Sequence, residues 1–102
     1  QILWNLVLNS YEAYNNTDIN IEIKPLNEDL LFSYRDNGPG ISDSLKQEII
    51  KPFFTTKKTG TGLGMFVVKT ICDKYGFDFN ILSSKDTLKG FGLDILIKKE
   101  PL

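Results

Sequence analysis

The sequence predicts an α+β fold, a two-layer α/β sandwich in which helices cover one face of a mixed, mostly antiparallel sheet. Two segments, at the start of the chain and after residue 62, carry apolar residues at helical spacing. Two pairs of segments, within 19–35 and within 77–97, alternate apolar and polar residues as strands do. Strands that follow one another in the chain, with helices on one side, favour this sandwich.

Composition limits the domain organisation and the class of function. The 102 residues are expected to form one domain, and 41% hydrophobic with 25% charged residues is typical of a soluble globular chain. The net charge of -1 shows no bias towards nucleic acid, and no apolar run approaches the roughly 18 residues of a membrane span. The single Cys72 excludes an internal disulfide and favours a cytoplasmic location.

The chain contains no histidine. The commonest general base and the commonest metal ligand are therefore missing. A reaction that needs a histidine must find it in another domain.

The first predicted element is a helix that begins at the first residues. Its apolar face is expected to consist of Leu3, Leu6, Val7, Ser10 and Ala13. Its polar stripe is expected to consist of Asn5, Asn9, Glu12 and Asn16. The helical pattern begins without a capping residue, so we expect a strand or a helix turn upstream. An amide oxygen is a hard ligand that suits Mg²⁺, so Asn5 and Asn9 are metal-site candidates; the alternative is a solvated helix face.

Two strands are predicted next, at 19–24 and 30–35. Isoleucines alternate with polar residues in the first, which Pro25 is expected to end. The turn that joins the strands is expected to contain Asn27, Glu28 and Asp29.

A glycine turn, Asp36-Asn37-Gly38-Pro39-Gly40, follows the second strand. An aspartate at a strand end can accept a hydrogen bond from an exocyclic amine. Glycines allow positive φ angles and let a planar ring approach the backbone closely. This turn is therefore a candidate base-binding site, and the alternative is a plain turn.

A short helix is predicted at 42–50, capped by Ser42 or Asp43 and ended by Pro52. Residues 51–61 are expected to form a mobile loop. A second long helix is predicted from Gly62 to about Tyr75 and ended by Gly76. Its apolar face is expected to consist of Leu63, Phe66, Val67, Thr70 and Ile71, with Cys72 a small buried hydrophobe nearby.

The segment Gly60-Thr61-Gly62-Leu63-Gly64 opens this second helix. Successive glycines free backbone N–H groups to point at an anion, and the helix N-terminus adds partial positive charge. Lys57 and Lys58 lie just upstream and could meet phosphates. The segment is neither a Walker A loop nor a dinucleotide-binding loop. We expect a phosphate site; the alternative is a flexible hinge.

Four segments in this order resemble the GHKL nucleotide-binding domain, also called the Bergerat fold. Residues 1–13 look like its N box, 36–40 like its first glycine box, 52–57 like its F box, and 60–64 like its second glycine box. The resemblance is to the histidine kinase branch, and the F box has the form typical of nitrogen-regulation sensor kinases. It implies that residues 1–102 are an ATP-binding catalytic domain of a two-component sensor histidine kinase, N-terminally truncated and without its acceptor-histidine domain.

The resemblance also implies roles for individual residues. Asn9 would coordinate Mg²⁺, Asp36 would bind the adenine amino group, and Asn5 and Lys57 would be the catalytic residues. Asn5 stands where ATP-hydrolysing relatives of the gyrase and MutL types carry a glutamate base, so hydrolysis should be slow. The residues implied to bind the nucleotide are Asn9, Ala13, Asp36, Gly38, Gly40, Ile41, Thr56, Lys57, Lys58, Gly60, Thr61, Gly62, Leu63 and Gly64.

The function implied is transfer of the γ-phosphate of Mg-ATP to a histidine on a separate dimerisation domain of the same parent protein. A response regulator would act downstream. This fragment would be a monomer and its parent a homodimer; membrane contact is expected of the parent at most. The alternative is a degenerate nucleotide-sensing or docking module. Phe66 and Phe91 depart from the family pattern and keep this alternative open, whereas the intact Asn9, Asp36 and glycine boxes favour the kinase.

Overall fold

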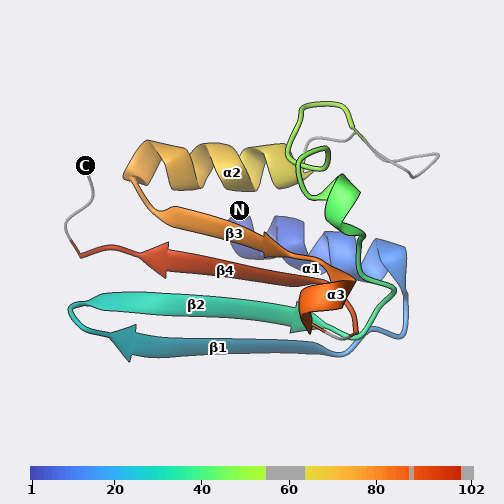
Figure 1. The fold of residues 1–102 in the computed structure, drawn as a ribbon, viewed down its shortest axis with the longest axis horizontal. Helices are drawn as coiled ribbons and strands as arrows, with labels where there is room; N and C mark the ends of the chain where they lie inside the picture. The colour runs from blue at the N-terminus through green and yellow to red at the C-terminus, as the bar shows by residue number, and fades with distance from the viewer. Residues whose placement is uncertain (55–63, 88, 100–102) are drawn as a thin grey trace.

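The computed structural model describes residues 1–54, 64–87 and 89–99. Seven helices and strands and one 3-10 turn follow in order within these ranges (Figure 1). They are α1 (Ile2–Ala13), β1 (Ile19–Leu26), β2 (Asp29–Asp36), the 3-10 turn η1 (Asp43–Leu45), α2 (Gly64–Tyr75), β3 (Asp78–Leu82), α3 (Ser84–Thr87) and β4 (Gly92–Ile97).

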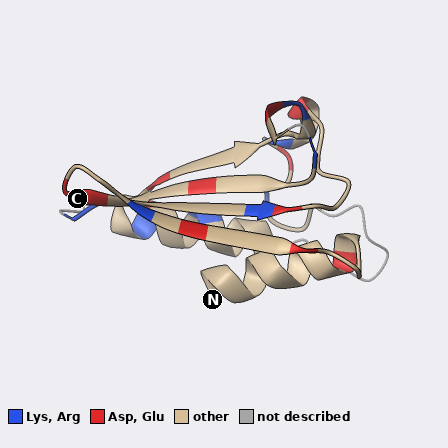
Figure 2. Cartoon of the chain, turned by 90° about the horizontal axis from the view of Figure 1, so that it is seen from below, with Lys and Arg blue, Asp and Glu red and all other residues tan. Residues whose placement is uncertain are grey.

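The four strands described form one sheet in the order β1-β2-β4-β3, and all three pairings are antiparallel. Helices α1 and α2 lie on the same face of the sheet, and the other face carries no helix along its length (Figure 2). The expected two-layer α/β sandwich with a mostly antiparallel sheet is therefore confirmed.

The core lies between the two long helices and the sheet. Strand register places Ile21, Tyr34, Leu93 and Ile81 in one row across the sheet on the helix side. Leu6 of α1 and Val68 and Cys72 of α2 pack onto this face, and each is at most 1% exposed. The predicted burial of Cys72 is thus confirmed.

Two expectations about the helices were wrong in detail. Leu3 and Ala13 are exposed, and the residues of α1 that are buried are Leu6 and Ser10. Helix α2 turns Met65, Val68 and Cys72 to the core, whereas Phe66 and Thr70 are exposed. Both stripes of α2 have helical spacing, so periodicity alone could not choose between them. Gly76, with a φ of 70°, ends α2 as predicted.

The expected end of the first strand at Pro25 was also wrong. Pro25 stays within β1 and pairs with Leu30 of β2. Strand β1 lies at an edge of the sheet, where the missing N–H of a proline costs no ladder hydrogen bond.

The helix expected at 42–50 is a single 3-10 turn, η1, followed by hydrogen-bonded turns. Ser42 occupies the N-cap position, but its side chain makes no capping bond. Residues 84–87 form a short helix, α3, that periodicity did not indicate. Helix α3 lies at the end of the sheet where β2 ends (Figure 1).

Candidate functional site

The carboxylate of Asp36 is the centre of the site at the end of β2. Among the described residues, three donors converge on it. The backbone N–H groups of Gly38 and Phe91 each donate to Oδ1 over 2.9 Å, and the Ser10 hydroxyl donates to Oδ2 over 2.6 Å. Asp36 is 9% exposed. Helix α1, strand β2 and the segment before β4 therefore meet at one buried carboxylate.

A buried hydroxyl pair continues from this carboxylate into the core. The oxygens of Ser10 and Tyr34 are 2.7 Å apart, and the Tyr34 hydroxyl donates to the Leu6 carbonyl over 3.1 Å. Burial raises the pKa of the Tyr34 hydroxyl above 10.0; the Ser10 hydrogen bond opposes this rise and the Asp36 carboxylate adds to it. Tyr34 therefore keeps its proton and acts as a donor over the physiological pH range.

Glycines allow the chain to pack tightly around Asp36. Gly40 and Gly90 have φ angles of 72° and 82°, a region that side chains strongly disfavour. A Cβ on Gly90 would collide with the Asp36 carbonyl, and a Cβ on Gly40 would lie 2.6 Å from the Gly90 carbonyl oxygen. The turn after β2 and the segment before β4 thus contact each other through bare backbone.

The segment that follows the turn after β2 contacts α3 through a hydrogen bond and an ion pair. The Ser84 N–H donates to the Ile41 carbonyl over 2.8 Å. Lys46 forms a 2.9 Å ion pair with Asp86, whose carboxylate also accepts hydrogen bonds from the N–H and hydroxyl of Ser83. Chiefly because of Lys46, and then of these bonds, the pKa of Asp86 falls from 3.8 to about 2.

The polar stripe of α1 meets the start of α2. A Cβ on Gly64 would lie 3.3 Å from Asn9 Nδ2, 3.4 Å from Asn9 Oδ1 and 3.5 Å from Asn5 Oδ1. The Asn5 side chain also donates to the Gln1 carbonyl over 2.9 Å. The glycine at the start of α2 therefore leaves a cradle against the two amide side chains of α1.

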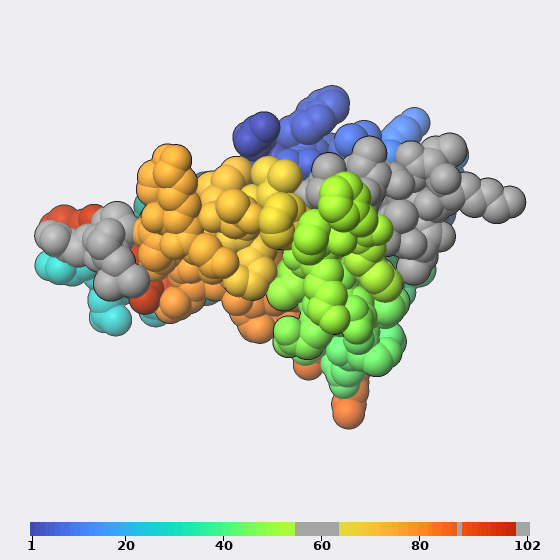
Figure 3. All heavy atoms as spheres, turned by 90° about the horizontal axis from the view of Figure 1, so that it is seen from above, coloured from blue at the N-terminus to red at the C-terminus, as the bar shows by residue number. Residues whose placement is uncertain are grey.

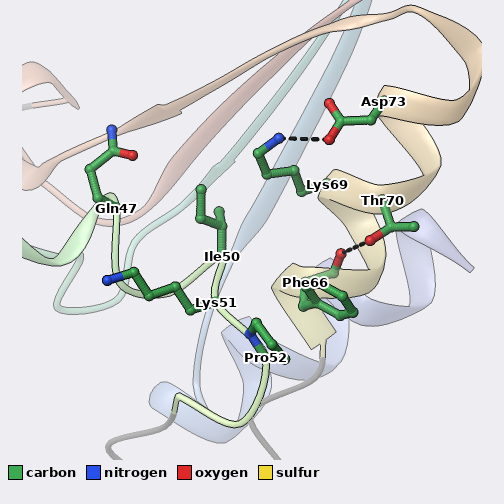
Figure 4. Close-up of a pocket in the computed structure, with 8 residues that line it drawn as sticks. All are labelled: Gln47, Ile50, Lys51, Pro52, Phe66, Lys69, Thr70 and Asp73. Carbon is green, nitrogen blue, oxygen red and sulfur yellow. Dashed lines mark hydrogen bonds and ion pairs between the residues drawn. The ribbon is translucent and has the colours of Figure 1, made fainter.

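A hollow of about 340 Å³ lies between α2 and the chain before it. Segment 41–54 lies directly beside the first turns of α2 (Figure 3). The hollow is lined by Gln47, Ile50, Lys51, Pro52, Phe66, Lys69, Thr70 and Asp73 (Figure 4). Phe66 therefore points away from the interface between α1 and α2, and it does not crowd that interface.

The structure brings together part of the predicted site. Asn5, Asn9 and Gly64 lie together, and Gly38 donates its N–H to Asp36. Gly40 packs against Gly90, and Ile41 after it is half-buried. Ala13 is exposed, and the side chain near Gly38 is instead that of Tyr14, the C-cap residue of α1, whose Cβ lies 3.5 Å from a Cβ built on Gly38. Thr56, Lys57, Lys58, Gly60, Thr61, Gly62 and Leu63 lie outside the described residues.

Four residues that hold Asp36 were missed as site residues. Ser10 belongs to the predicted apolar face of the first helix, and Tyr34 lies within the strand predicted at 30–35. Nothing in the local pattern links positions 24 residues apart. Phe91 contacts Asp36 through its backbone N–H, which its side chain does not reveal. Gly90 was not predicted as a turn residue, although it packs against the Asp36 backbone. The available signals were a serine on the predicted apolar face next to Asn9 and the departure of Phe91 from the family pattern.

Residues 1–54, 64–87 and 89–99 contain neither the side-chain cluster of a metal site nor a membrane-spanning helix. No three acidic, cysteine or histidine side chains gather there as a metal cluster would need. No helix in these ranges is long and apolar enough to cross a membrane.

Known proteins resemble this chain over nearly its whole length. Residues 1–100 match the family described as "Histidine kinase-, DNA gyrase B-, and HSP90-like ATPase". The sensor histidine kinase ZraS of Salmonella typhimurium is 38% identical over 78 residues, which cover 74% of this chain. The nitrogen regulation protein NtrY of Azorhizobium caulinodans is 30% identical over 84 residues, also 74% of this chain. The nitrogen-regulation branch is therefore one of several that resemble it.

A solved structure, the catalytic domain of the histidine kinase ThkA, superposes with a TM-score of 0.80 at 35% identity. It covers 97% of this chain, and this chain covers 64% of it. The chain spans only 17% of the length of ZraS and 11% of NtrY. The chain belongs to the family of histidine kinase-, DNA gyrase B- and HSP90-like ATPases, in its form found in sensor histidine kinases.

Proposed function

We propose that this domain binds Mg-ATP and donates the γ-phosphate to a histidine on a separate dimerisation domain of its parent protein. The observation that carries the proposal is the pairing of two polar centres on α1. Ser10 reaches the Asp36 carboxylate beside the glycine turn, and the adjacent Asn9 faces Gly64 at the start of α2. One centre suits a purine amine and the other a metal-bound phosphate.

The base end of the site is built for an acceptor role. Asp36 would accept a hydrogen bond from the exocyclic amine of adenine. Gly38 and Gly40 would let the ring lie against bare backbone, with Ile41 and Tyr14 nearby. Guanine carries a carbonyl oxygen at the corresponding position, which would repel a carboxylate, so this end favours ATP.

The phosphate end fits a hard cation. The amide oxygen of Asn9 would hold Mg²⁺, and the Gly64 cradle leaves room beside it. When bound, the metal would neutralise charge on the phosphates. The N-terminus of α2 adds partial positive charge on the same side. Lys57, Lys58, Thr56, Gly60, Thr61, Gly62 and Leu63 are proposed to complete this end.

The position of Asn5 favours transfer over hydrolysis. Its amide donates to the Gln1 carbonyl one turn before Asn9, and an amide cannot remove a proton from water. The proposed nucleophile is an imidazole of the dimerisation domain. A response regulator is the proposed final acceptor; the fragment is proposed to be a cytoplasmic monomer and its parent a homodimer.

The alternative, a degenerate nucleotide-sensing or docking module, draws support from Phe66 and Phe91. Neither departure removes a hydrogen bond to Asp36 in the described residues. Phe66 faces the hollow beside α2, and Phe91 donates its backbone N–H to Asp36. These positions favour the enzyme.

The proposal is tested by transfer of radiolabelled γ-phosphate from ATP to a separately purified dimerisation domain that carries the acceptor histidine. Wild type should label that domain only with Mg²⁺ present, and basal hydrolysis should be slow. Asn9→Ala should abolish labelling, whereas the control Asn80→Ala, an exposed asparagine of β3, should not change it. ATP binding without any labelling would favour the sensing module instead.

A further inference from the structure

We propose that Ser10, itself held by Tyr34, is a positioning residue that aims one oxygen of Asp36 at the exocyclic amine of the bound base. The inference rests on the proposed function, because it concerns how the base end of that site recognises adenine. It adds two residues from the buried side of the site, which do not touch the nucleotide themselves.

The direction of the hydrogen bonds follows from proton counting. Ser10 has one hydroxyl proton and donates it to Asp36 Oδ2 over 2.6 Å. Its oxygen can therefore only accept from Tyr34, which lies 2.7 Å away. Tyr34 also has only one proton, which it shares between two acceptors, the Ser10 oxygen at 2.7 Å and the Leu6 carbonyl oxygen at 3.1 Å, as a three-centre hydrogen bond. The chain of donors thus runs from Tyr34 through Ser10 to Asp36.

Counting acceptor positions shows which oxygen remains for a ligand. A carboxylate offers about four lone-pair positions, two on each oxygen. The N–H groups of Gly38 and Phe91 fill both positions on Oδ1. Ser10 fills one position on Oδ2. Among the described residues these are the donors, so the remaining acceptor position lies on Oδ2, at an angle that Ser10 sets.

Burial makes this arrangement rigid. Ser10 is 3% exposed and Tyr34 is fully buried at the centre of the sheet, so water does not compete for their hydroxyls. Ser10 follows Asn9 directly on α1. One helix therefore fixes the base anchor and the metal ligand relative to each other, as a site for an extended nucleotide requires.

A purely structural role for the two hydroxyls makes a different prediction. If they only satisfied one another in the core, their loss would lower stability and weaken every nucleotide alike. If they aim Oδ2, their loss would weaken only nucleotides that carry the amine. Base preference therefore separates the two roles.

The test compares calorimetric binding of Mg-ATP with that of Mg-purine riboside triphosphate, which lacks the 6-amino group. Wild type should prefer ATP. Ser10→Ala should lower ATP affinity about tenfold and leave the affinity for the amine-free nucleotide unchanged. Ser10→Thr, which keeps the hydroxyl, should retain the preference. Tyr34→Phe, which keeps the ring in the core, should give an intermediate loss.

Thermal unfolding of each variant checks that the fold is retained, and Tyr34→Phe provides a second reading if Ser10→Ala unfolds. An unchanged ATP preference in both folded variants would overturn the inference, as would equal losses for the two nucleotides. Failure of the proposed function appears elsewhere, in the wild type. Wild-type protein that bound neither nucleotide, or both equally, would remove adenine recognition and the inference with it.

Discussion

Replacing Gly90 by alanine should destabilise the domain more than any other single methyl group added at the site. Gly90 has a φ of 82°, and a left-handed conformation costs an alanine about 1–2 kcal/mol. The new Cβ would also collide with the Asp36 carbonyl, which is backbone and cannot rotate away. Overpacking of this kind adds about 1–3 kcal/mol, so the expected total is about 2–5 kcal/mol.

Urea unfolding followed by far-ultraviolet circular dichroism measures this cost. A domain of this size has a total stability of about 5–15 kcal/mol, so a large share should be lost. With a slope of about 1.5 kcal/mol per molar, a loss of 3 kcal/mol moves the midpoint down by about 2 M. ATP affinity should fall as well, because the Phe91 N–H that holds Asp36 Oδ1 follows Gly90 directly.

Gly38→Ala is the matched control for stability. Gly38 lies in the turn after β2, also beside Asp36, and has no positive φ. A Cβ there would meet Asp36 Oδ1 at 3.4 Å and the Tyr14 Cβ at 3.5 Å, which are ordinary contacts. The free energy of unfolding of Gly38→Ala should stay within about 0.5 kcal/mol of the wild-type value. If Gly90→Ala were as stable as this control, the close backbone packing around Asp36 would be refuted.

Three further predictions follow from single groups. Gly64→Ala should keep the folding stability or raise it by at most about 1 kcal/mol. It should weaken Mg-ATP binding several-fold, because the new Cβ displaces the Asn9 amide. Unchanged Mg-ATP affinity would contradict the claim that Gly64 leaves room for the Asn9 side chain to bind the metal. Burial raises the pKa of Cys72 from 9.0 to about 11, so native protein holds the thiol proton and stability is lost as pH rises through that range. The loss is about 1 kcal/mol between pH 8 and 10 and is visible in urea midpoints. It should be absent from Cys72→Ala, and equal losses in both proteins would contradict this prediction. The pKa of Asp86 is lowered to about 2, so its ionised carboxylate contributes to folding stability above pH 3.8, and this contribution is lost as the pH falls to about 2. Lys46→Met should raise the pKa of Asp86 in an NMR titration. An unchanged pKa would exclude the ion pair with Lys46 as the main cause of the shift.

Local patterns predicted most of the fold because each core element follows its own period. The alternation of apolar and polar residues located β2, β3 and β4 to within about one residue, and Gly76 marked the end of α2. Pro25 misled because its effect depends on strand order. Only the position of β1 at a sheet edge makes a proline harmless there, and strand order is a property of the whole fold.

The face of α2 shows a second kind of limit. Its two stripes are both apolar, and the chain around Ile50 and Pro52 partly covers the stripe that carries Phe66. Which stripe enters the core is decided by what each one meets in space. Sequence spacing alone carries no information on that point.

The residues of the candidate site also differ in whether the sequence could reveal them. Asn9, Asp36 and the glycines were found because their residue types carry their chemistry. The Tyr34–Ser10 pair and the Phe91 N–H were not, because their roles arise from contacts across 24 and 55 residues of sequence. The positions of Ser10 and Tyr34 are compatible with a plain core role. A backbone N–H is present in every residue except proline, so the residue type at position 91 does not reveal it as a donor.

The most direct test of the central claim is calorimetric titration of the chain with Mg-ATP, beside the variant Asp36→Asn. Wild type should bind one nucleotide per chain. Asp36→Asn should keep its fold and lose at least about tenfold in affinity, because a charged acceptor for the adenine amine has been replaced by a neutral amide. Equal affinity of the folded variant and wild type would contradict a site in which Asp36 recognises ATP.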